Sequence, residues 1–155
     1  MATLATLCYI ERDGKYLMLH RIKKQSDMHK GLWVGLGGKL EPGESPEECV
    51  VREVFEESGL TIHDPRLRGI LTFPADAGNA DWYVFLFSAT QFEGEIRECD
   101  EGELHWIDKD EVPALPMHEG DRLFLRKLNE CKGLFTAKYR YECDVLKDCS
   151  FCLYE

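Results

Sequence analysis

The feature that most constrains this chain is a helix whose two ends are both marked in the sequence. Ser45 suits the N-cap position, Pro46 suits the first helical position, and Glu48 stands three residues after Ser45, which completes a capping box. Gly59 can adopt the left-handed conformation that commonly ends a helix. The sequence therefore predicts a helix over 46–58, around which the remaining segments must be arranged.

One side of this predicted helix is acidic. At about 100° per residue, Glu53, Glu56 and Glu57 fall in one stripe. The opposite side is apolar and comprises Val50, Val51, Val54 and Phe55. A solvated polar face is the ordinary explanation of such a stripe. However, Glu53 and Glu57 repel each other at i,i+4, and a divalent cation with oxygen ligands would turn that repulsion into coordination.

A glycine-rich loop leads into the helix. It contains Gly35, Gly37, Gly38 and Gly43, which let the backbone turn sharply and approach a ligand, and Lys39 adds a compact positive charge. Most isolated glycines only serve turns, but these precede a helix with three clustered glutamates. The combination predicts a site at which backbone groups and Lys39 meet a phosphate ligand or a metal ion.

The segments outside the loop and the first helix are mostly of β type. An Asp-Gly turn at 13–14 joins the runs 5–10 and 15–21, which predicts a hairpin. Further strands are expected at 67–73, 81–90, 104–107, 135–141 and 150–154, with a second helix at about 120–131. Because the strands are grouped around two helices, we expect an α+β fold, a mixed sheet with helices packed on it. The length and the absence of linkers predict a single domain spanning residues 1–155.

The charge balance limits the partners of the protein. There are 19 Lys and Arg against 29 Asp and Glu, a net charge of −10. Such a chain is unsuited to sequence-independent binding of long nucleic acid, whereas a small phosphate ligand remains compatible if divalent cations mediate. No leader-like start and no membrane-length apolar run is present, so we expect a cytoplasmic protein without a membrane partner.

Seven cysteines make complete internal pairing impossible, and their irregular scatter predicts free thiols. Cys149 and Cys152 have C-x-x-C spacing, so a zinc or redox site is the alternative for this pair, although no second motif accompanies it. No metal-ligand spacing connects the histidines, which are His20, His29, His63, His105 and His118.

The residues around the acidic helix resemble the Nudix box. Gly38 is followed after five residues by Glu44, and after seven more by Arg52-Glu53-Val54-Phe55-Glu56-Glu57-Ser58-Gly59-Leu60. Beyond the box, the whole chain looks like the MutT-like 8-oxo-dGTP diphosphatases of that family. The resemblance implies a Nudix fold, an αβα sandwich in which the box forms a loop-helix-loop. It also implies hydrolysis of a nucleoside diphosphate derivative with Mg²⁺ or Mn²⁺.

The resemblance further implies a catalytic and metal-binding set. Glu53, Glu56 and Glu57 would be metal ligands, the region of Gly38 would supply a backbone carbonyl or a phosphate contact, and Arg52 would orient the glutamates.

The resemblance also implies one more carboxylate, acting as metal ligand or general base, on the loop before 104–107, although as a plain acidic loop this segment would need no function. Glu101 is our choice, with Glu98 and Glu103 as alternatives.

Substrate contacts are expected on both sides of this set. Arg21 can engage two phosphate oxygens, and Lys39 and the adjoining loop residue Gly37 lie near them in the pattern. Val34 stands where some relatives have an Asn that reads the oxidised purine, so the base must be read by other groups. Glu119 and Asp121 open the second predicted helix and are candidates either for reading the base or for capping the helix.

The sequence thus predicts an enzyme that hydrolyses a nucleoside triphosphate, 8-oxo-dGTP in the first place, to the monophosphate and pyrophosphate. The alternatives are a Nudix pyrophosphohydrolase for another nucleoside diphosphate derivative and a non-catalytic nucleotide-sensing module. The intact box glutamates favour an enzyme. Its expected partner is a small nucleotide, and its expected state is a monomer or a homodimer.

Overall fold

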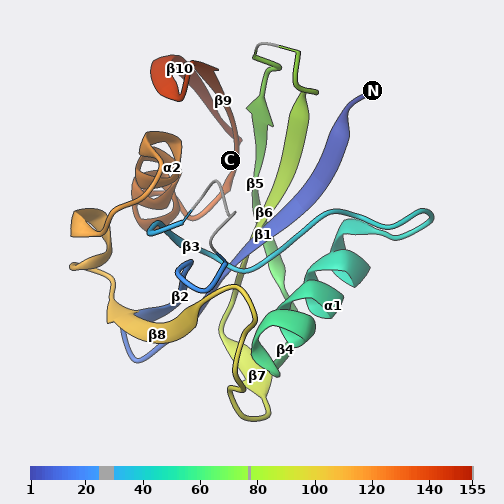
Figure 1. Ribbon diagram of the computed structural model, residues 1–155, viewed down its shortest axis with the longest axis vertical. Helices are drawn as coiled ribbons and strands as arrows, with labels where there is room; N and C mark the ends of the chain where they lie inside the picture. Colours follow the sequence, from blue (N-terminus) through green and yellow to red (C-terminus); the bar gives the residue numbers. More distant parts are fainter. Residues whose placement is uncertain (25–29, 77, 155) are drawn as a thin grey trace.

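A mixed β-sheet forms the centre of the protein (Figure 1). The computed structural model describes residues 1–24, 30–76 and 78–154, and His29 therefore lies outside the described residues. Within these ranges the sheet has eight strands in the order β10-β9-β5-β6-β1-β2-β3, with β8 paired to β2, and β4 and β7 form a separate two-stranded sheet. The elements are β1 (Thr3–Arg12), β2 (Lys15–His20), β3 (Trp33–Val34), α1 (Pro46–Ser58), β4 (Thr61–His63), β5 (Arg66–Phe73), β6 (Trp82–Ala89), β7 (Gln91–Glu93), β8 (Glu103–Asp108), a short 3-10 helix (Val112–Ala114), α2 (Glu119–Glu130), β9 (Leu134–Glu142) and β10 (Val145–Tyr154).

The two α-helices cover opposite faces of the sheet (Figure 1). Successive side chains of a strand point to opposite faces, so β1 contributes to two cores. Ala5 and Tyr9 pack in the core that contains Phe124 of α2. Cys8 and Ile10 pack in the core that contains the apolar face of α1. This confirms the predicted α+β class and the αβα sandwich with a mixed sheet.

Most elements agree with the sequence-based expectations. α1 has the predicted bounds, α2 begins and ends one residue earlier than expected, and the predicted hairpin is formed by β1 and β2. β10 begins at Val145, five residues before the predicted strand start. The short strands β3, β4 and β7 were not predicted, because two or three residues carry no readable alternation. In the described ranges, no helix is long and apolar enough to cross a membrane.

The caps of α1 have the predicted geometry. The amide of Glu48 donates to Oγ of Ser45 at 3.1 Å, and Oε1 of Glu48 accepts from the amide of Ser45 at 2.9 Å. Gly59 has φ 84°, and its amide donates to the carbonyl of Phe55 at 2.8 Å. Both ends of the helix are therefore fixed by local contacts, which hold its acidic face in a defined direction.

The expectation that Phe55 belongs to the apolar face of α1 is wrong. Its side chain is 46% exposed, whereas Val50 and Val54 are fully buried. On a helical wheel Phe55 lies about 140° from Val50, beyond the stripe that the sheet covers. The guanidinium of Arg97 lies 4.8 Å from the centre of the Phe55 ring and covers it instead.

The seven cysteines are free thiols, as expected. Cys149 and Cys152 are exposed on β10, and a spacing of three residues places them on opposite faces of a strand. They therefore do not form one binding site within the chain. β10 is also the outermost strand of the sheet, and most of its residues are exposed.

The capping box predicts a measurable loss of stability. We expect Ser45→Ala to lower the free energy of unfolding by about 1 kcal/mol, because the amide of Glu48 loses its acceptor. Chemical denaturation of the wild type and the variant measures this difference. Ser150→Ala, at an exposed position of β10, is the control and should change stability much less. Equal effects of the two substitutions would contradict the role of the cap.

Candidate active site

The three glutamates of α1 differ in burial because they lie at different angles to the core. Glu57 follows Val50 by seven residues and so lies only about 20° from it on the helix, at the edge of the buried face. Glu57 is accordingly half-buried. The side chain of Glu53 is 18% exposed and that of Glu56 is 56% exposed. The acidic stripe thus runs from the core to solvent.

Glu57 is held against the glycine-rich loop. The amide of Gly37 donates to Oε1 of Glu57 at 2.8 Å. Burial raises the pKa of Glu57 to about 8; the hydrogen bond from Gly37 and the positive charge of Arg21 act in the opposite direction, and the negative charges of Glu101 and Glu53 raise it further. A cation placed beside Glu57 would favour the ionised form of this carboxyl.

The loop itself lies in hydrogen-bonding contact with β1. The amide of Thr6 donates to the carbonyl of Gly38 at 2.8 Å, and the amide of Cys8 donates to the carbonyl of Leu36 at 2.6 Å. A Cβ on Gly37 would lie 2.1 Å from the carbonyl oxygen of Thr6, and one on Gly38 would lie 2.4 Å from the carboxyl carbon of Glu53. Glycine is therefore required at position 37, where the neighbour is the backbone of β1, whereas a Cβ on Gly38 would displace the carboxylate of Glu53 from the loop.

Arg52 connects the carboxylates outside the core. Its guanidinium donates two hydrogen bonds to Glu44, at 2.7 and 2.9 Å, and one to Oε1 of Glu53 at 2.8 Å. It also reaches Oε2 of Glu56 at 3.3 Å and the carbonyl of Lys39 at 3.1 Å. Arg52 is thus placed where it orients two of the three helix glutamates and the loop.

Glu44 was not among the residues selected from the sequence, although it is a fixed position of the Nudix box. The hydrogen bonds from Arg52 lower the pKa of Glu44 to about 2, with a further contribution from the amide of Glu41. Glu44 therefore remains ionised and holds the guanidinium in place. The signal that could have revealed it is its position eight residues before Arg52 at the start of the same box.

The structure distinguishes the three candidate carboxylates, of which Glu98 and Glu101 precede β8 and Glu103 begins it. Oε2 of Glu101 lies 3.5 Å from the guanidinium of Arg21, and its charge acts on Glu57. Glu98 instead accepts from Lys23 at 3.1 Å and is largely exposed, and Glu103 lies 3.3 Å from His105. The arrangement thus brings Glu101 and Arg21 together beside Glu57.

The donor set fits a hard divalent cation. Carboxylate oxygens are the ligands that Mg²⁺ and Mn²⁺ prefer, and the side chain of Glu53 fills the space that a Cβ on Gly38 would occupy. Within residues 1–24, 30–76 and 78–154, however, no three His, Cys, Asp or Glu side chains converge as a ready metal-binding group. Glu53 and Glu56 are directed at Arg52, so they would have to rotate towards a cation.

A cavity of about 320 Å³ lies on the other face of the sheet, next to the loop. Its lining combines aromatic residues with polar groups and consists of Phe73, Trp82, Val84, His118, Asp121, Tyr141 and Asp144. Nζ of Lys39 lies 5.4 Å from the centre of the Trp82 ring, so the glycine-rich loop and this cavity adjoin. An aromatic cavity with few polar groups, next to a glycine-rich loop that carries a lysine, has the composition that suits a nucleobase.

The two acidic residues that open α2 have different surroundings. Asp121 lines the cavity, and burial raises its pKa to about 7, against the lowering effect of Arg122. Glu119 is exposed, pairs with Arg122 and does not line the cavity. The N-cap residue of α2 is His118, which makes no side-chain cap hydrogen bond. The structure thus places Asp121, and not Glu119, in the cavity, and neither residue is the N-cap.

Val34 and Trp33 support the sheet. Val34 packs against the core on the α1 side. The ring of Trp33 stacks on His20 with a centroid distance of 4.2 Å and packs against the core on the α2 side. Trp33 is therefore a partly buried residue at the edge of this core.

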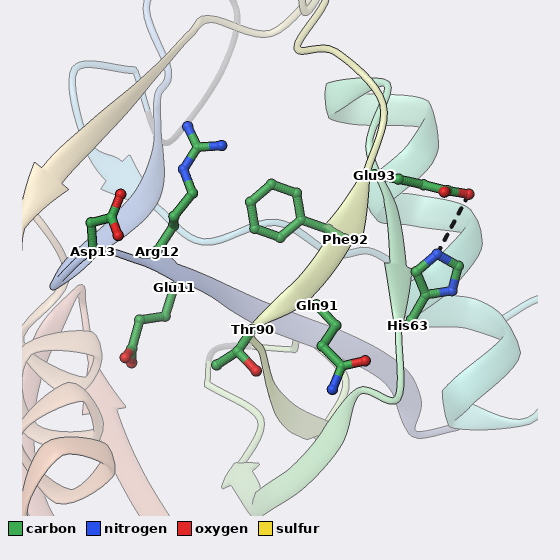
Figure 2. A pocket seen from close by; sticks show the side chains of 8 residues that line it. All are labelled: Glu11, Arg12, Asp13, His63, Thr90, Gln91, Phe92 and Glu93. Atoms are coloured by element: carbon green, nitrogen blue, oxygen red, sulfur yellow. Dashed lines mark ion pairs between the residues drawn. The ribbon is translucent and has the colours of Figure 1, made fainter.

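A larger cavity, of about 650 Å³, lies at the far end of β6. Figure 2 shows Arg12 and Phe92 extending towards each other across it, and His63 paired with Glu93 at 3.5 Å. The guanidinium of Arg12 also lies 4.6 Å from the Trp106 ring. Trp82 begins β6 and Thr90 follows its end, so this cavity is separated from the Asp121 cavity by the length of the strand.

Comparison with known proteins agrees with this geometry. Residues 1–128 match the family model of the NUDIX domain, so the chain belongs to the Nudix family. It is 35% identical over 139 residues to the oxidized purine nucleoside triphosphate hydrolase of Danio rerio, covering 90% of this chain and 86% of that protein. It is also 35% identical over 140 residues to YvcI, an uncharacterized Nudix hydrolase of Bacillus subtilis, covering 88% and 85%. The crystal structure of the mutator MutT protein from Bacillus halodurans is 34% identical, covers 96% of this chain and 97% of that chain, and has a TM-score of 0.86.

These similarities confirm the predicted family and fold. The protein is a Nudix hydrolase with a MutT-like fold. Nudix hydrolases act on small nucleotide substrates and generally use divalent metal ions such as Mg²⁺.

The raised pKa of Glu57 predicts that metal binding depends on pH. A carboxyl with a pKa of about 8 is mostly protonated at pH 6 and must release its proton to coordinate a cation. The affinity of the nucleotide-free protein for Mn²⁺ should therefore rise about tenfold per pH unit between pH 6 and pH 8 and level off above. Titration of the protein with Mn²⁺, followed by electron paramagnetic resonance, measures this affinity. Glu57→Gln should bind Mn²⁺ more weakly, with an affinity that does not change with pH. A pH-independent affinity of the wild type would contradict the assignment of Glu57 as a metal ligand.

Proposed function

We propose that the protein hydrolyses a purine nucleoside triphosphate, 8-oxo-dGTP in the first place, to the nucleoside monophosphate and pyrophosphate. The observation that carries this proposal is the placement of Asp121 in an aromatic cavity that adjoins Lys39 and the glycine-rich loop. The similarity to the oxidized purine nucleoside triphosphate hydrolase of Danio rerio supports the choice of substrate class. A cytoplasmic location and a monomeric or dimeric state accompany the proposal as expectations from the sequence.

In this proposal the carboxylates at the α1 face hold the divalent cations. Glu53, Glu56 and Glu57 would be ligands, and Glu101 would complete the set or accept the proton of the attacking water. When bound, Mg²⁺ supplies positive charge that offsets the phosphate charge and activates water. The carbonyl of Gly38 already accepts from Thr6, so a metal ion or a phosphate contact would have to use its second lone pair or a neighbouring group of the loop.

The cationic side chains would act on the phosphates and on the carboxylates. Lys39, exposed beside Trp82, would contact the departing pyrophosphate. Arg21 is paired with Glu101 and would exchange this carboxylate for a phosphate group as substrate enters. Arg52, held by Glu44, would fix the directions of Glu53 and Glu56.

The base would lie in the cavity against Trp82 and Phe73. A carboxyl with a pKa near 7 has both protonation states available at neutral pH. Asp121 can therefore donate a hydrogen bond to a base carbonyl or accept one from a ring nitrogen. In this proposal Asp121 would therefore recognise the base, and no Asn is needed at position 34.

The two alternatives make different demands on the site. A Nudix pyrophosphohydrolase for a nucleotide sugar or a dinucleoside polyphosphate would use the same carboxylates with a different group in the cavity. A nucleotide-sensing module would not need the Glu44–Arg52 network that directs Glu53 and Glu56, so this network favours the enzyme.

The products test the proposed reaction. By similarity to the MutT-like group, we expect attack at the β-phosphorus, which leaves the monophosphate and places the oxygen of the attacking water in pyrophosphate. Hydrolysis of 8-oxo-dGTP in ¹⁸O-labelled water with Mg²⁺, followed by mass spectrometry of both products, measures this. Activity should disappear in EDTA. Orthophosphate with a nucleoside diphosphate, or label in the monophosphate, would show that a different bond or atom is attacked.

Substitution of Asp121 tests the reading of the base. We expect Asp121→Asn to reduce the ratio of kcat/KM for 8-oxo-dGTP over dGTP by about 5- to 100-fold, because a buried polar partner would be left unmatched. Glu119→Gln, two residues earlier on the same helix, is the control and should leave this ratio unchanged. An unchanged ratio in Asp121→Asn together with a reduced ratio in Glu119→Gln would exclude Asp121 as the residue that reads the base.

Asp121 should also make stability depend on pH. Its folded pKa of about 7 lies above the ordinary value of 3.8, so the folded state binds more protons between these pH values. The free energy of unfolding should therefore fall as pH rises from about 4 to about 7, by at most about 4 kcal/mol. Chemical denaturation of the metal-free wild type and of Asp121→Asn across this pH range isolates the contribution of Asp121. In the variant, the free energy of unfolding should not show this part of the decrease with rising pH.

A further inference from the structure

The cavity that contains Asp121 is completed by a part of the chain that the family model does not reach. The match to the NUDIX domain ends at residue 128, and β9 and β10 follow it. β9 pairs with β5 in parallel, from Gly69 opposite Phe135 to Thr72 opposite Lys138. This pairing brings Tyr141, near the end of β9, beside Phe73 at the end of β5, where both line the cavity.

Tyr141 makes a specific contact with the first turn of α2. The amide of Gly120 donates to the hydroxyl oxygen of Tyr141 at 2.7 Å. The first amides of a helix have no acceptor within the helix, and the side chain of His118 does not cap them. A hydroxyl from β9 thus supplies the acceptor. Because Gly120 directly precedes Asp121, the bond fixes the backbone from which the Asp121 carboxyl extends.

The approach of Tyr141 depends on glycine at position 120. A Cβ there would lie 2.7 Å from the hydroxyl oxygen of Tyr141. The ring of Tyr141 is stacked against that of Phe73 with an interplanar angle of 29° and a centroid distance of 6.5 Å. The turn after β9 is tied to the loop after β5, where the amide of Cys143 donates to Oδ2 of Asp76 at 2.8 Å. The hydroxyl therefore belongs to a firmly held wall of the cavity.

We propose that Tyr141 is a positioning residue for base selection, which sets the direction of Asp121 through the amide of Gly120. This inference rests on the proposed function of the cavity and deepens it. It places part of the substrate selectivity in the β9–β10 hairpin, at residues 134–154, outside the segment that carries the family motif.

The chain offers a matched control at the other end of the same helix. The hydroxyl of Tyr16 donates to Oδ1 of Asn129 at 2.7 Å. Tyr16 and Tyr141 thus each connect a strand to α2 by one hydrogen bond of equal length. Tyr16 and Asn129 do not line the Asp121 cavity. Loss of the Tyr16 hydroxyl therefore shows how stability and activity change when α2 loses a hydrogen bond away from the cavity.

The experiment compares Tyr141→Phe with Tyr16→Phe. Both retain the ring and remove the hydroxyl. We expect Tyr141→Phe to raise KM for the preferred nucleotide and to reduce its kcat/KM ratio over the unmodified purine by about 3- to 10-fold, with kcat nearly unchanged. Tyr16→Phe should lower the melting temperature similarly and leave both the ratio and KM unchanged. Hydrogen exchange of the Gly120 amide should accelerate in Tyr141→Phe.

Two results would overturn the proposal. One is an unchanged nucleotide ratio in Tyr141→Phe with a loss of stability like that of Tyr16→Phe, which would make the hydroxyl a structural anchor only. The other is an equal change of the ratio in both variants, which would trace the effect to a general loosening of α2. If Tyr141→Phe fails to fold, Tyr141→His and Tyr141→Gln, which retain a polar group that can accept, should fold, and their nucleotide ratio should follow the protection of the Gly120 amide in hydrogen exchange. A wild-type ratio in a variant whose Gly120 amide exchanges faster would contradict the proposal.

Failure of the proposed function would give a different result. Dissociation constants for 8-oxo-dGMP and dGMP, measured by calorimetry without metal, report the cavity independently of hydrolysis. If the wild type binds these monophosphates selectively but cleaves no triphosphate, the proposed function is wrong, and the ratio of dissociation constants in Tyr141→Phe still decides the role of Tyr141. If the wild type binds neither, or both equally, the cavity selects no oxidised base and the proposal for Tyr141 is overturned.

Discussion

The site depends on the absence of a side chain at Gly37. This glycine lies in the loop between β1 and α1, and a Cβ at this position would collide with the backbone of Thr6, whereas a Cβ on Gly38 would meet only the movable carboxylate of Glu53. Because the backbone fits there, the amide of Gly37 reaches Glu57 and the carbonyl of Gly38 joins β1. The loop is thus fixed to the sheet by backbone hydrogen bonds and to the acidic helix by the side chain of Glu57, which sets the position of the helix relative to the sheet.

The elements with local signals were predictable from the sequence. The bounds of α1 follow from Ser45, Glu48 and Gly59, all within one turn of the helix ends. The exposure of Phe55 was not predictable, because it depends on how far the sheet extends over the helix and on Arg97 from a distant loop. Helical periodicity gives the direction of a side chain, but not what another segment places in that direction.

The same limit applies to the site. The box glutamates were selected from their spacing and from the resemblance to the Nudix box, and Arg52 from the resemblance alone; the structure places Arg52 in contact with Glu53 and Glu56. For Asp121, base reading and capping could not be separated in the sequence, because the answer depends on contacts with residues of β5, β6 and β9 that are distant along the chain. Tyr141 carried no signal at all, since one tyrosine in a strand is ordinary until its hydroxyl is found at the amide of Gly120.

The outermost strand β10 has a consequence for handling the protein. It presents one unpaired backbone edge together with exposed Phe151, Leu153 and Tyr154 and the thiols of Cys149 and Cys152. Edge strands of this kind are templates on which a further chain can add, and exposed thiols oxidise to covalent bridges between molecules. We therefore expect association and thiol oxidation in concentrated solution to begin at this edge, which a reducing buffer would protect.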